Sequence, residues 1–129
     1  MAAQRTRPTE AELAILRVLW TRGASTVREV HAVLGNATGY TTVLKLMQIM
    51  AEKGLVERDE LAAGQRAHVY RAAHAQAQTQ GQLLGYLVER AFGGSAAGLM
   101  MQLLSDRAAT REEIAELRKL LDEHERRQG

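Results

Sequence analysis

The chain has 129 residues, a length that suits one domain or two small domains with a shared core. Hydrophobic residues make up 46% and charged residues 25%, which excludes a wholly disordered chain. There is no cysteine, so disulfides, a thiol nucleophile and cysteine-based zinc or copper sites are excluded. The net charge is only +2, but residues 1–74 carry ten Lys and Arg against seven Asp and Glu. The positive excess therefore lies in the N-terminal half, a weak indication of an anionic partner there.

Neither a membrane anchor nor an export signal is predicted. The longest apolar stretch without a charge, residues 91–105, is too short to cross a bilayer and contains three glycines. Arg5 and Arg7 are followed by Pro8 and a polar segment, and not by the apolar run of a signal peptide. We therefore expect a cytoplasmic protein with no membrane partner.

Three helices are predicted in the first half of the chain. Thr9 with Glu12, and Thr26 with Glu29, have the spacing of capping boxes, in which each side chain bonds the other residue's backbone amide. The third helix is expected over residues 40–53, with its apolar residues on an inner face. Each predicted helix is followed by a glycine that stops it, namely Gly23, Gly35 and Gly54.

A two-stranded hairpin is predicted after the third helix. Residues 55–59 and 67–71 are typical of strands, and residues 61–65, which include Gly64, predict the turn between them. In the second strand Val69 is expected to face opposite to its two neighbours in the sequence. Three helices followed by a hairpin is the order of elements in a winged helix-turn-helix.

The second half of the chain is predicted to be helical from about His74 onward. A helix with an apolar stripe ends at a glycine pair, and a short apolar helix follows it. A third capping box, Thr110 with Glu113, begins a last helix with near-heptad apolar spacing. The predicted fold class is mainly α, with a winged helix-turn-helix domain over residues 1–73 and a helical dimerisation domain over residues 74–129.

A homodimer is predicted because a half of this size cannot bury the apolar faces of its helices alone. The residues expected at the dimer contact are Leu87, Phe92, Leu117 and Leu121. Some of these side chains could instead pack within one protomer, and the sequence does not separate the two cases.

The third helix has the composition of a helix that reads DNA. A helix that enters the major groove shows short polar or cationic side chains near its N-terminus, where Thr can meet thymine, Gln adenine, and Lys guanine or phosphate. The alternative is an ordinary helix start with a solvated surface, which the order of elements and the charge asymmetry disfavour. The predicted DNA-binding residues are Tyr40, Thr41, Thr42, Lys45 and Gln48 of the helix and Arg66 and His68 of the hairpin.

The sequence resembles the BlaI/MecI/CopY family of bacterial transcriptional repressors over nearly its whole length. The segments that carry the resemblance are TEAELAILRVLW (9–20), TVREVHAVL (26–34), YTTVLKLMQIMAEKGLV (40–56), RAHVYR (66–71), LVERAFGG (87–94) and REEIAELRKLLD (111–122). The resemblance implies a homodimer that binds a palindromic double-stranded DNA operator through its winged helices and is released by an inducing signal on its C-terminal half. It places Thr41, Thr42 and Lys45 where the family's recognition helix meets bases, with Gln48 nearby.

Two departures from the family pattern bear on the inducing signal and on DNA anchoring. The copper-sensing branch carries Cys-x-Cys, so a copper-thiolate sensor is excluded in a chain without cysteine. In the β-lactam branch a protease cleaves an Asn-Phe bond, and Gln102-Leu103 stands at that position here. Gln102 and Leu103 are therefore the candidate cleavage region, with an inducing protease or receptor as a further partner, and the inducer stays open. Ile49 replaces an Arg that often faces the DNA backbone.

No enzyme, metal site or cofactor is predicted. There is no phosphate-binding glycine loop and no His-Glu-x-x-His spacing, and the four histidines are scattered. The alternative to a DNA-binding repressor is a winged-helix module for protein contact or small-molecule sensing. DNA binding would weaken steeply with salt, whereas an apolar protein interface would be nearly indifferent to it.

Overall fold

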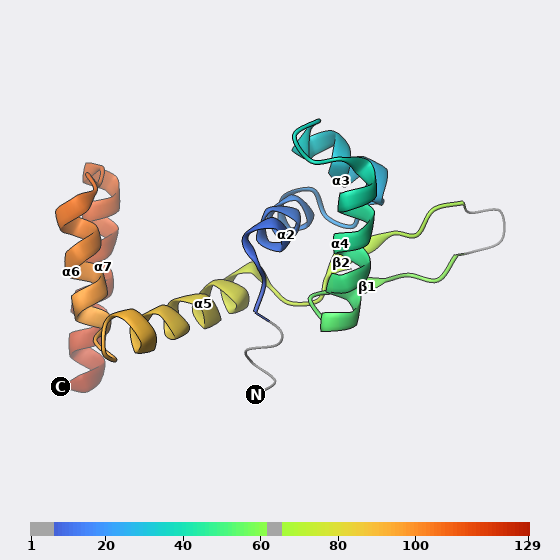
Figure 1. Ribbon diagram of the computed structural model, residues 1–129. Helices are drawn as coiled ribbons and strands as arrows, with labels where there is room; N and C mark the ends of the chain where they lie inside the picture. The colour runs from blue at the N-terminus through green and yellow to red at the C-terminus, as the bar shows by residue number, and fades with distance from the viewer. Residues whose placement is uncertain (1–6, 62–65) are drawn as a thin grey trace. The chain divides into compact units, whose positions relative to one another are not determined.

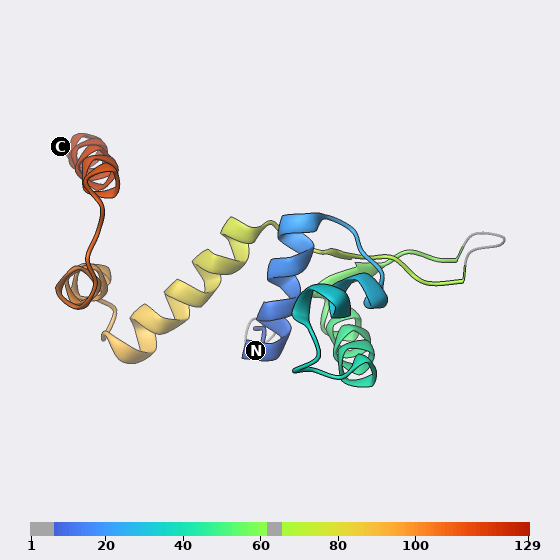
Figure 2. The same cartoon turned by 90° about the horizontal axis from the view of Figure 1, so that it is seen from above.

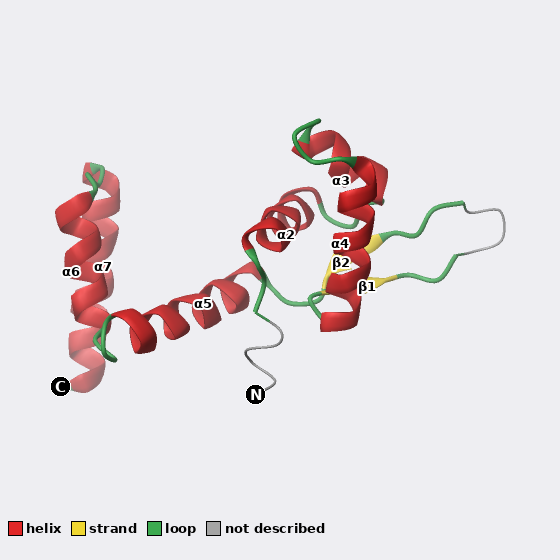
Figure 3. Cartoon of the chain, viewed as in Figure 1, coloured by secondary structure: helices red, strands yellow, loops and turns green. Residues whose placement is uncertain are grey.

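A computed structural model describes residues 7–61 and 66–129 and is mainly helical, with one small antiparallel sheet (Figure 3). This confirms the predicted fold class. The chain divides into two compact units, one ending at Leu84 and the other beginning at Gly85, within one helix. The elements are α2 (Glu10–Arg22), α3 (Val27–Leu34), α4 (Tyr40–Lys53), β1 (Val56–Arg58), β2 (Tyr70–Ala72), α5 (Gln76–Ala91), α6 (Ala96–Asp106) and α7 (Arg111–Gln128).

The starts of α2, α3 and α7 and the ends of α2, α3 and α4 lie at the residues that local sequence signals predicted. The Thr9 hydroxyl accepts a hydrogen bond from the Glu12 backbone N–H, and the Glu12 carboxylate accepts one from the Thr9 N–H. The same reciprocal pair begins α3 at Thr26 and α7 at Thr110. Gly54, which follows α4, has a φ of 79°, a left-handed conformation that only glycine adopts readily.

The core of the N-terminal unit joins α2, α3 and α4 to the hairpin (Figure 1). From α4 it takes Val43, Met47 and Met50, and each of these side chains is 0% exposed. Burying a side chain of this size is worth about 1.5–3 kcal/mol, so these three residues hold one face of α4 firmly inward. The other buried hydrophobic residues are Ile15, Leu16, Val18, Leu19, Val27, Val30, Leu55, Val56 and Tyr70.

The hairpin is shorter than the sequence predicted. β1 pairs with β2 in the register Val56 with Ala72 and Arg58 with Tyr70, so the second strand begins at Tyr70 and not at residue 67. One further bond runs from the Asp59 N–H to the Val69 carbonyl, but the Asp59 carbonyl lies 2.9 Å from Nδ1 of His68. Because a carbonyl only accepts, the His68 imidazole is the donor in this bond. If the strand pairing continued, the Asp59 carbonyl would accept from a backbone N–H of the second strand instead. Of the predicted turn, residues 62–65 lie outside the described residues.

A third segment pairs with the hairpin at Ser25, between α2 and α3. The Ser25 N–H donates to the Tyr70 carbonyl at 2.9 Å, and the Tyr70 N–H donates to the Ser25 carbonyl at 2.8 Å. β2 is therefore paired on both edges, with β1 on one side and Ser25 on the other, and the Tyr70 side chain lies in the core. This pairing ties the hairpin to the start of α3.

The C-terminal unit has little core of its own. α5 is one continuous helix (Figure 2), and α6 and α7 follow it. Among the described residues from Gly85 onward, Leu99 is the one buried hydrophobic side chain. The exposed large hydrophobic residues of this unit are Tyr86, Leu87, Met100, Met101, Leu103, Leu104, Ile114, Leu117, Leu120 and Leu121.

A buried ion pair joins the start of α2 to the end of α4. Nζ of Lys53 lies 2.6 Å from Oε1 of Glu12, whose side chain is only 3% exposed. Burial raises the pKa of the Glu12 carboxyl, but hydrogen bonds from Lys53 and from the Thr9 N–H, with the charge of Lys53, outweigh burial. The pKa of Glu12 therefore lies below its ordinary value, and the pair stabilises the fold in its charged form.

The substitution Glu12→Gln tests this ion pair. We expect the free energy of unfolding near neutral pH to fall by about 1–2 kcal/mol, because Lys53 loses a charged acceptor while the shape of the side chain is kept. Since the folded-state pKa of Glu12 is depressed, its contribution is present above the ordinary pKa and is lost as the pH falls through the folded-state value. Urea unfolding at decreasing pH should show the difference from wild type shrinking. Glu10→Gln, in the exposed first turn of α2, is the control, and an equal loss there would contradict the assignment.

Candidate nucleic-acid interface

The outer face of α4 is polar and exposed. Thr41, Thr42, Lys45 and Gln48 are all exposed, on the side of the helix opposite Val43, Met47 and Met50. The N-cap of α4 is Gly39, which provides no side-chain cap, and no acidic residue occupies the first turn. In contrast, α2, α3 and α7 each begin with a capping box that includes a glutamate. The positive end of the α4 dipole therefore has no acidic side chain in its first turn to oppose a bound anion.

A groove of about 450 Å³ lies between α4, the start of α3 and the hairpin. From α4 it is lined by Tyr40, Leu44 and Gln48, which follow one another at intervals of four residues along one side of the helix. The polar and charged residues that line it from the other two elements are Thr26, Arg28, Arg58, Arg66 and His68.

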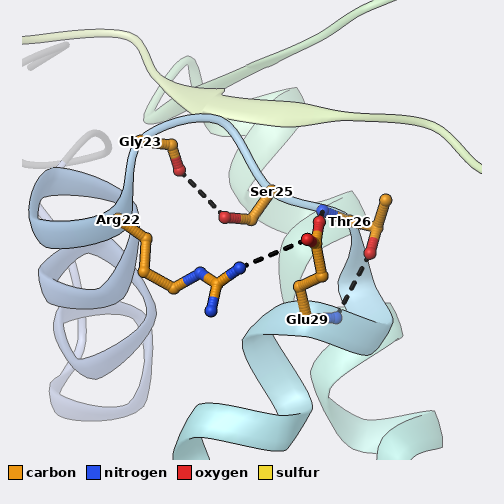
Figure 4. Close-up of polar contacts among 5 residues, drawn as sticks. All are labelled: Arg22, Gly23, Ser25, Thr26 and Glu29. Carbon is orange, nitrogen blue, oxygen red and sulfur yellow. Dashed lines mark hydrogen bonds and ion pairs between the residues drawn. The ribbon is translucent and has the colours of Figure 1, made fainter.

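Polar contacts between α2 and α3 hold the start of α3 at this groove (Figure 4). The Glu29 N–H donates to the Thr26 hydroxyl at 3.2 Å, and the Thr26 N–H donates to the Glu29 carboxylate at 2.8 Å. The Arg22 guanidinium lies 3.2 Å from the same carboxylate, and the Ser25 hydroxyl donates to the Gly23 carbonyl at 2.9 Å. The two hydrogen bonds with Thr26, of which the Thr26 N–H bond is the larger cause, and the charge of Arg22 lower the pKa of Glu29. The negative charge of Glu29 is thereby already engaged by Thr26 and Arg22.

The cations of the N-terminal unit fall into two groups. Arg22, Lys53 and Arg71 form ion pairs with Glu29, with Glu12, and with Glu57 and Asp59, respectively. A second group forms no ion pair with any residue that the structure describes: Arg17, Arg28, Lys45, Arg58 and Arg66. Three of these five line the groove, Lys45 lies on the exposed face of α4, and Arg17 lies on the exposed surface of α2. Most of the unpaired positive charge among the described residues is thus found around α4.

Two aromatic side chains at the groove are also oriented by contacts within the unit. The rings of Tyr40 and His31 meet edge to face, with centroids 5.9 Å apart, so the C-terminal part of α3 supports the first residue of α4. Nδ1 of His68 donates a hydrogen bond to the Asp59 carbonyl, which leaves Nε2 as the ring nitrogen available to a ligand.

The structure brings together some of the predicted DNA-binding residues but not all of them. Tyr40, Gln48, Arg66 and His68 line the groove, whereas Thr41, Thr42 and Lys45 lie on the exposed face of α4 beside it. The sequence-based list missed Arg28 and Arg58, which also line the groove. No local sequence signal marks these two arginines, because only the packing of α3 and β1 beside α4 brings them to the groove.

The residues predicted for the C-terminal half lie mostly on the surface of this unit. Leu87 and Leu121 are exposed, Leu117 is 38% exposed, and Phe92 is half-buried next to Gly98. The bond between Gln102 and Leu103 lies inside α6, and the Gln102 amide donates to Asp106 one turn later. In this structure the candidate cleavage region is helical.

Two further searches were made over the part of the chain that the structure describes. No three of its histidine, aspartate and glutamate side chains lie close enough to hold a metal ion. None of its helices combines the length and the apolar character needed to cross a membrane.

Comparison with known proteins gives a family and a fold. The sequence model of the penicillinase repressor family matches residues 8–123. Similar solved structures include a mutant of MarR from E. coli in complex with operator DNA, with a TM-score of 0.52, 19% identity, and coverage of 95% of this chain and 84% of that one. Another is the transcriptional regulator Tm0710 from Thermotoga maritima, with a TM-score of 0.53, 18% identity, and coverage of 97% and 84%. A search of curated protein sequences gave no significant match.

At these identities the likeness to the solved structures shows a shared fold, that of winged-helix regulators. The family match covers most of the chain, including both the winged unit and the C-terminal helices. The resemblance inferred from sequence is thereby confirmed. The chain belongs to the penicillinase repressor family of DNA-binding transcriptional regulators.

Proposed function

We propose that this protein is a cytoplasmic repressor that binds a palindromic operator as a homodimer, with α4 of each protomer in the major groove. The observation that carries the proposal is the concentration of unpaired cations around the exposed polar face of α4. A helix entering the major groove needs polar side chains toward the bases and cations at its flanks toward the phosphates. The N-terminal unit offers both on one side of α4.

The residues divide into two roles in this proposal. Thr41, Thr42, Lys45 and Gln48 read base edges, because they project from the exposed face of the helix near its N-terminus. Arg28, Arg58 and Arg66 bind phosphates beside the helix, since α3 and the hairpin lie next to α4 at the groove. Tyr40 and His68, which line the same groove, contact the sugar-phosphate backbone.

The substitution Lys45→Ala tests base reading. On a palindromic duplex selected from a random library, we expect a loss of about 1–3 kcal/mol in binding free energy and relaxed discrimination at one base position. Lys119→Ala, on the polar side of α7, removes an equal charge far from α4 in the sequence and should leave discrimination unchanged. Mobility-shift titration measures both. An unchanged affinity for the combined Lys45→Ala and Thr42→Ala variant would contradict the assignment of α4 as the helix that reads bases.

The substitution Arg58→Ala tests phosphate binding in the same titration. Because a phosphate contact carries no sequence information, we expect a similar loss on every duplex and a salt slope that falls by about one. Arg71→Ala removes the arginine of β2 that is already bound to Glu57 and Asp59, and it should change the salt slope less. Binding that is indifferent to salt would favour a protein-contact module over a DNA-binding one.

The homodimer is supported by the missing core of the C-terminal unit. A set of large apolar side chains is exposed on α5, α6 and α7, while a single one, Leu99, is buried among the described residues of this unit. Soluble monomers rarely expose a continuous apolar surface of this kind. A second copy of the chain, with its own α6 and α7, offers a surface of the same chemistry.

The substitution Leu117→Asp tests the dimer. Replacing the leucine removes about 1.5–3 kcal/mol of burial free energy in each protomer, and the new carboxylate would have to be desolvated in the apolar interface of α7. We therefore expect a monomer. Lys119→Asp introduces the same side chain on the opposite side of the helix and should remain a dimer. Sedimentation equilibrium distinguishes the two, and an unchanged dimer for Leu117→Asp would contradict the proposed interface.

Release from DNA is proposed to act through the C-terminal half. Two winged units joined in one dimer gain avidity of about 10²–10⁴ over a single unit, without any new contact to DNA. An inducer therefore needs only to separate the dimer, and an inducing protease that cuts near Gln102 and Leu103 would do so. Because this bond lies inside α6, the helix must open locally before a protease can bind it.

Cleavage at a foreign protease site inserted after Gln102 tests this mechanism. We expect operator affinity to fall by about 10²-fold or more on complete cleavage, because the avidity of the dimer is lost. The uncleaved insertion variant must first bind as wild type does, and the same site appended after Gly129 is the matched control. Full affinity after complete cleavage would require the mechanism to be abandoned.

A further inference from the structure

The first turns of α5 are anchored to the N-terminal unit. The Ala73 N–H donates to the Leu55 carbonyl at 3.0 Å, and Nε1 of Trp20 donates to the His74 carbonyl at 3.0 Å. Thr79, in the first turn of the helix, is only 5% exposed. The direction in which α5 leaves the winged unit is therefore fixed up to about this residue.

The support weakens after Thr79. Leu83 and Val88 are half-buried, but no side chain of α5 after Thr79 is fully buried, and Gln80, Gln82 and Leu84 are exposed. The boundary between the two compact units falls in the same stretch, between Leu84 and Gly85. A helical segment with little tertiary packing depends mainly on its intrinsic helix propensity.

Two exposed glycines, Gly81 and Gly85, lie in this weakly packed segment. Neither has the positive φ that would require glycine, and a Cβ added at either position would meet no atom within 4 Å. Alanine would therefore fit at both positions in this protomer. Glycine instead disfavours the helical state by about four- to fivefold relative to alanine at each position, because its backbone has more freedom to lose.

We propose that Gly81 and Gly85 form a hinge in α5 that determines which separations between two operator half-sites the dimer can bind. This inference rests on the proposed binding of two half-sites by a homodimer. The anchored start of α5 moves with the winged unit, and the weak segment lets the rest of the helix bend relative to it. A wider range of bends allows both α4 helices to reach major grooves at more than one spacing.

The test is the double substitution Gly81→Ala and Gly85→Ala in the full chain. Gln80→Ala with Gln82→Ala is the matched control, because it changes exposed residues of the same segment without removing a glycine. In the absence of DNA, hydrogen exchange of the amides at residues 81–89 should become about tenfold slower in the glycine variant than in wild type or the control. Equal exchange in all three proteins would overturn the hinge, whether or not the protein binds DNA.

Affinity is then measured on palindromic duplexes whose half-sites are moved together or apart by single base pairs. We expect the glycine variant to bind the best spacing as wild type does and to lose at least severalfold more affinity at the other spacings. Equal spacing profiles would overturn the role in specificity. Loss of the dimer in sedimentation would also overturn it, by showing that the glycines serve close approach of a second chain. Binding of no duplex by wild type would defeat the proposed function, and slower exchange in the glycine variant would still support a weak segment.

Discussion

The burial of one face of α4 is the constraint on which the remaining structure depends. Val43, Met47 and Met50 are completely buried against α2, α3 and the hairpin, and together they fix the rotation of the helix about its axis. Successive residues of a helix are about 100° apart, so a rotation by one residue would put Thr42, Leu46 and Ile49 in the core in place of these three. The same three side chains that stabilise the N-terminal unit thus determine which polar residues of α4 can reach a partner.

Electrostatics in this unit follow from local pairing and not from net charge. A net charge of +2 on the chain says little about a DNA-binding surface. The informative difference is between Lys53, which is held by buried Glu12 and serves the fold, and Arg58, which has no ion-pair partner among the described residues and lines the groove. The same distinction applies to the acidic residues: Glu29 is already bound by Thr26 and Arg22 and serves the fold.

The parts of the fold that could be predicted from sequence are those set by local interactions. The ends of α2, α3 and α7 follow from Thr-x-x-Glu boxes and glycines, because cap and partner are three residues apart. The Glu12–Lys53 and Trp20–His74 contacts join residues 41 and 54 positions apart, and no local pattern marks them. Arg28 and Arg58 were missed for the same reason: only tertiary packing places α3 and β1 beside α4. The early end of the hairpin depends on one His68 side chain that replaces a backbone donor.

The two halves of the chain differ in how they are stabilised, and this difference connects assembly to regulation. The winged unit contains its own core, whereas α6 and α7 leave most of their apolar side chains exposed. In the proposed dimer these helices are stabilised by the partner, so their stability depends on protein concentration and on anything that binds or cuts them. The winged unit keeps its fold when the dimer separates, because its core does not involve α6 or α7. In the proposed mechanism, an inducing signal therefore abolishes tight operator binding while α4 and its surroundings remain intact.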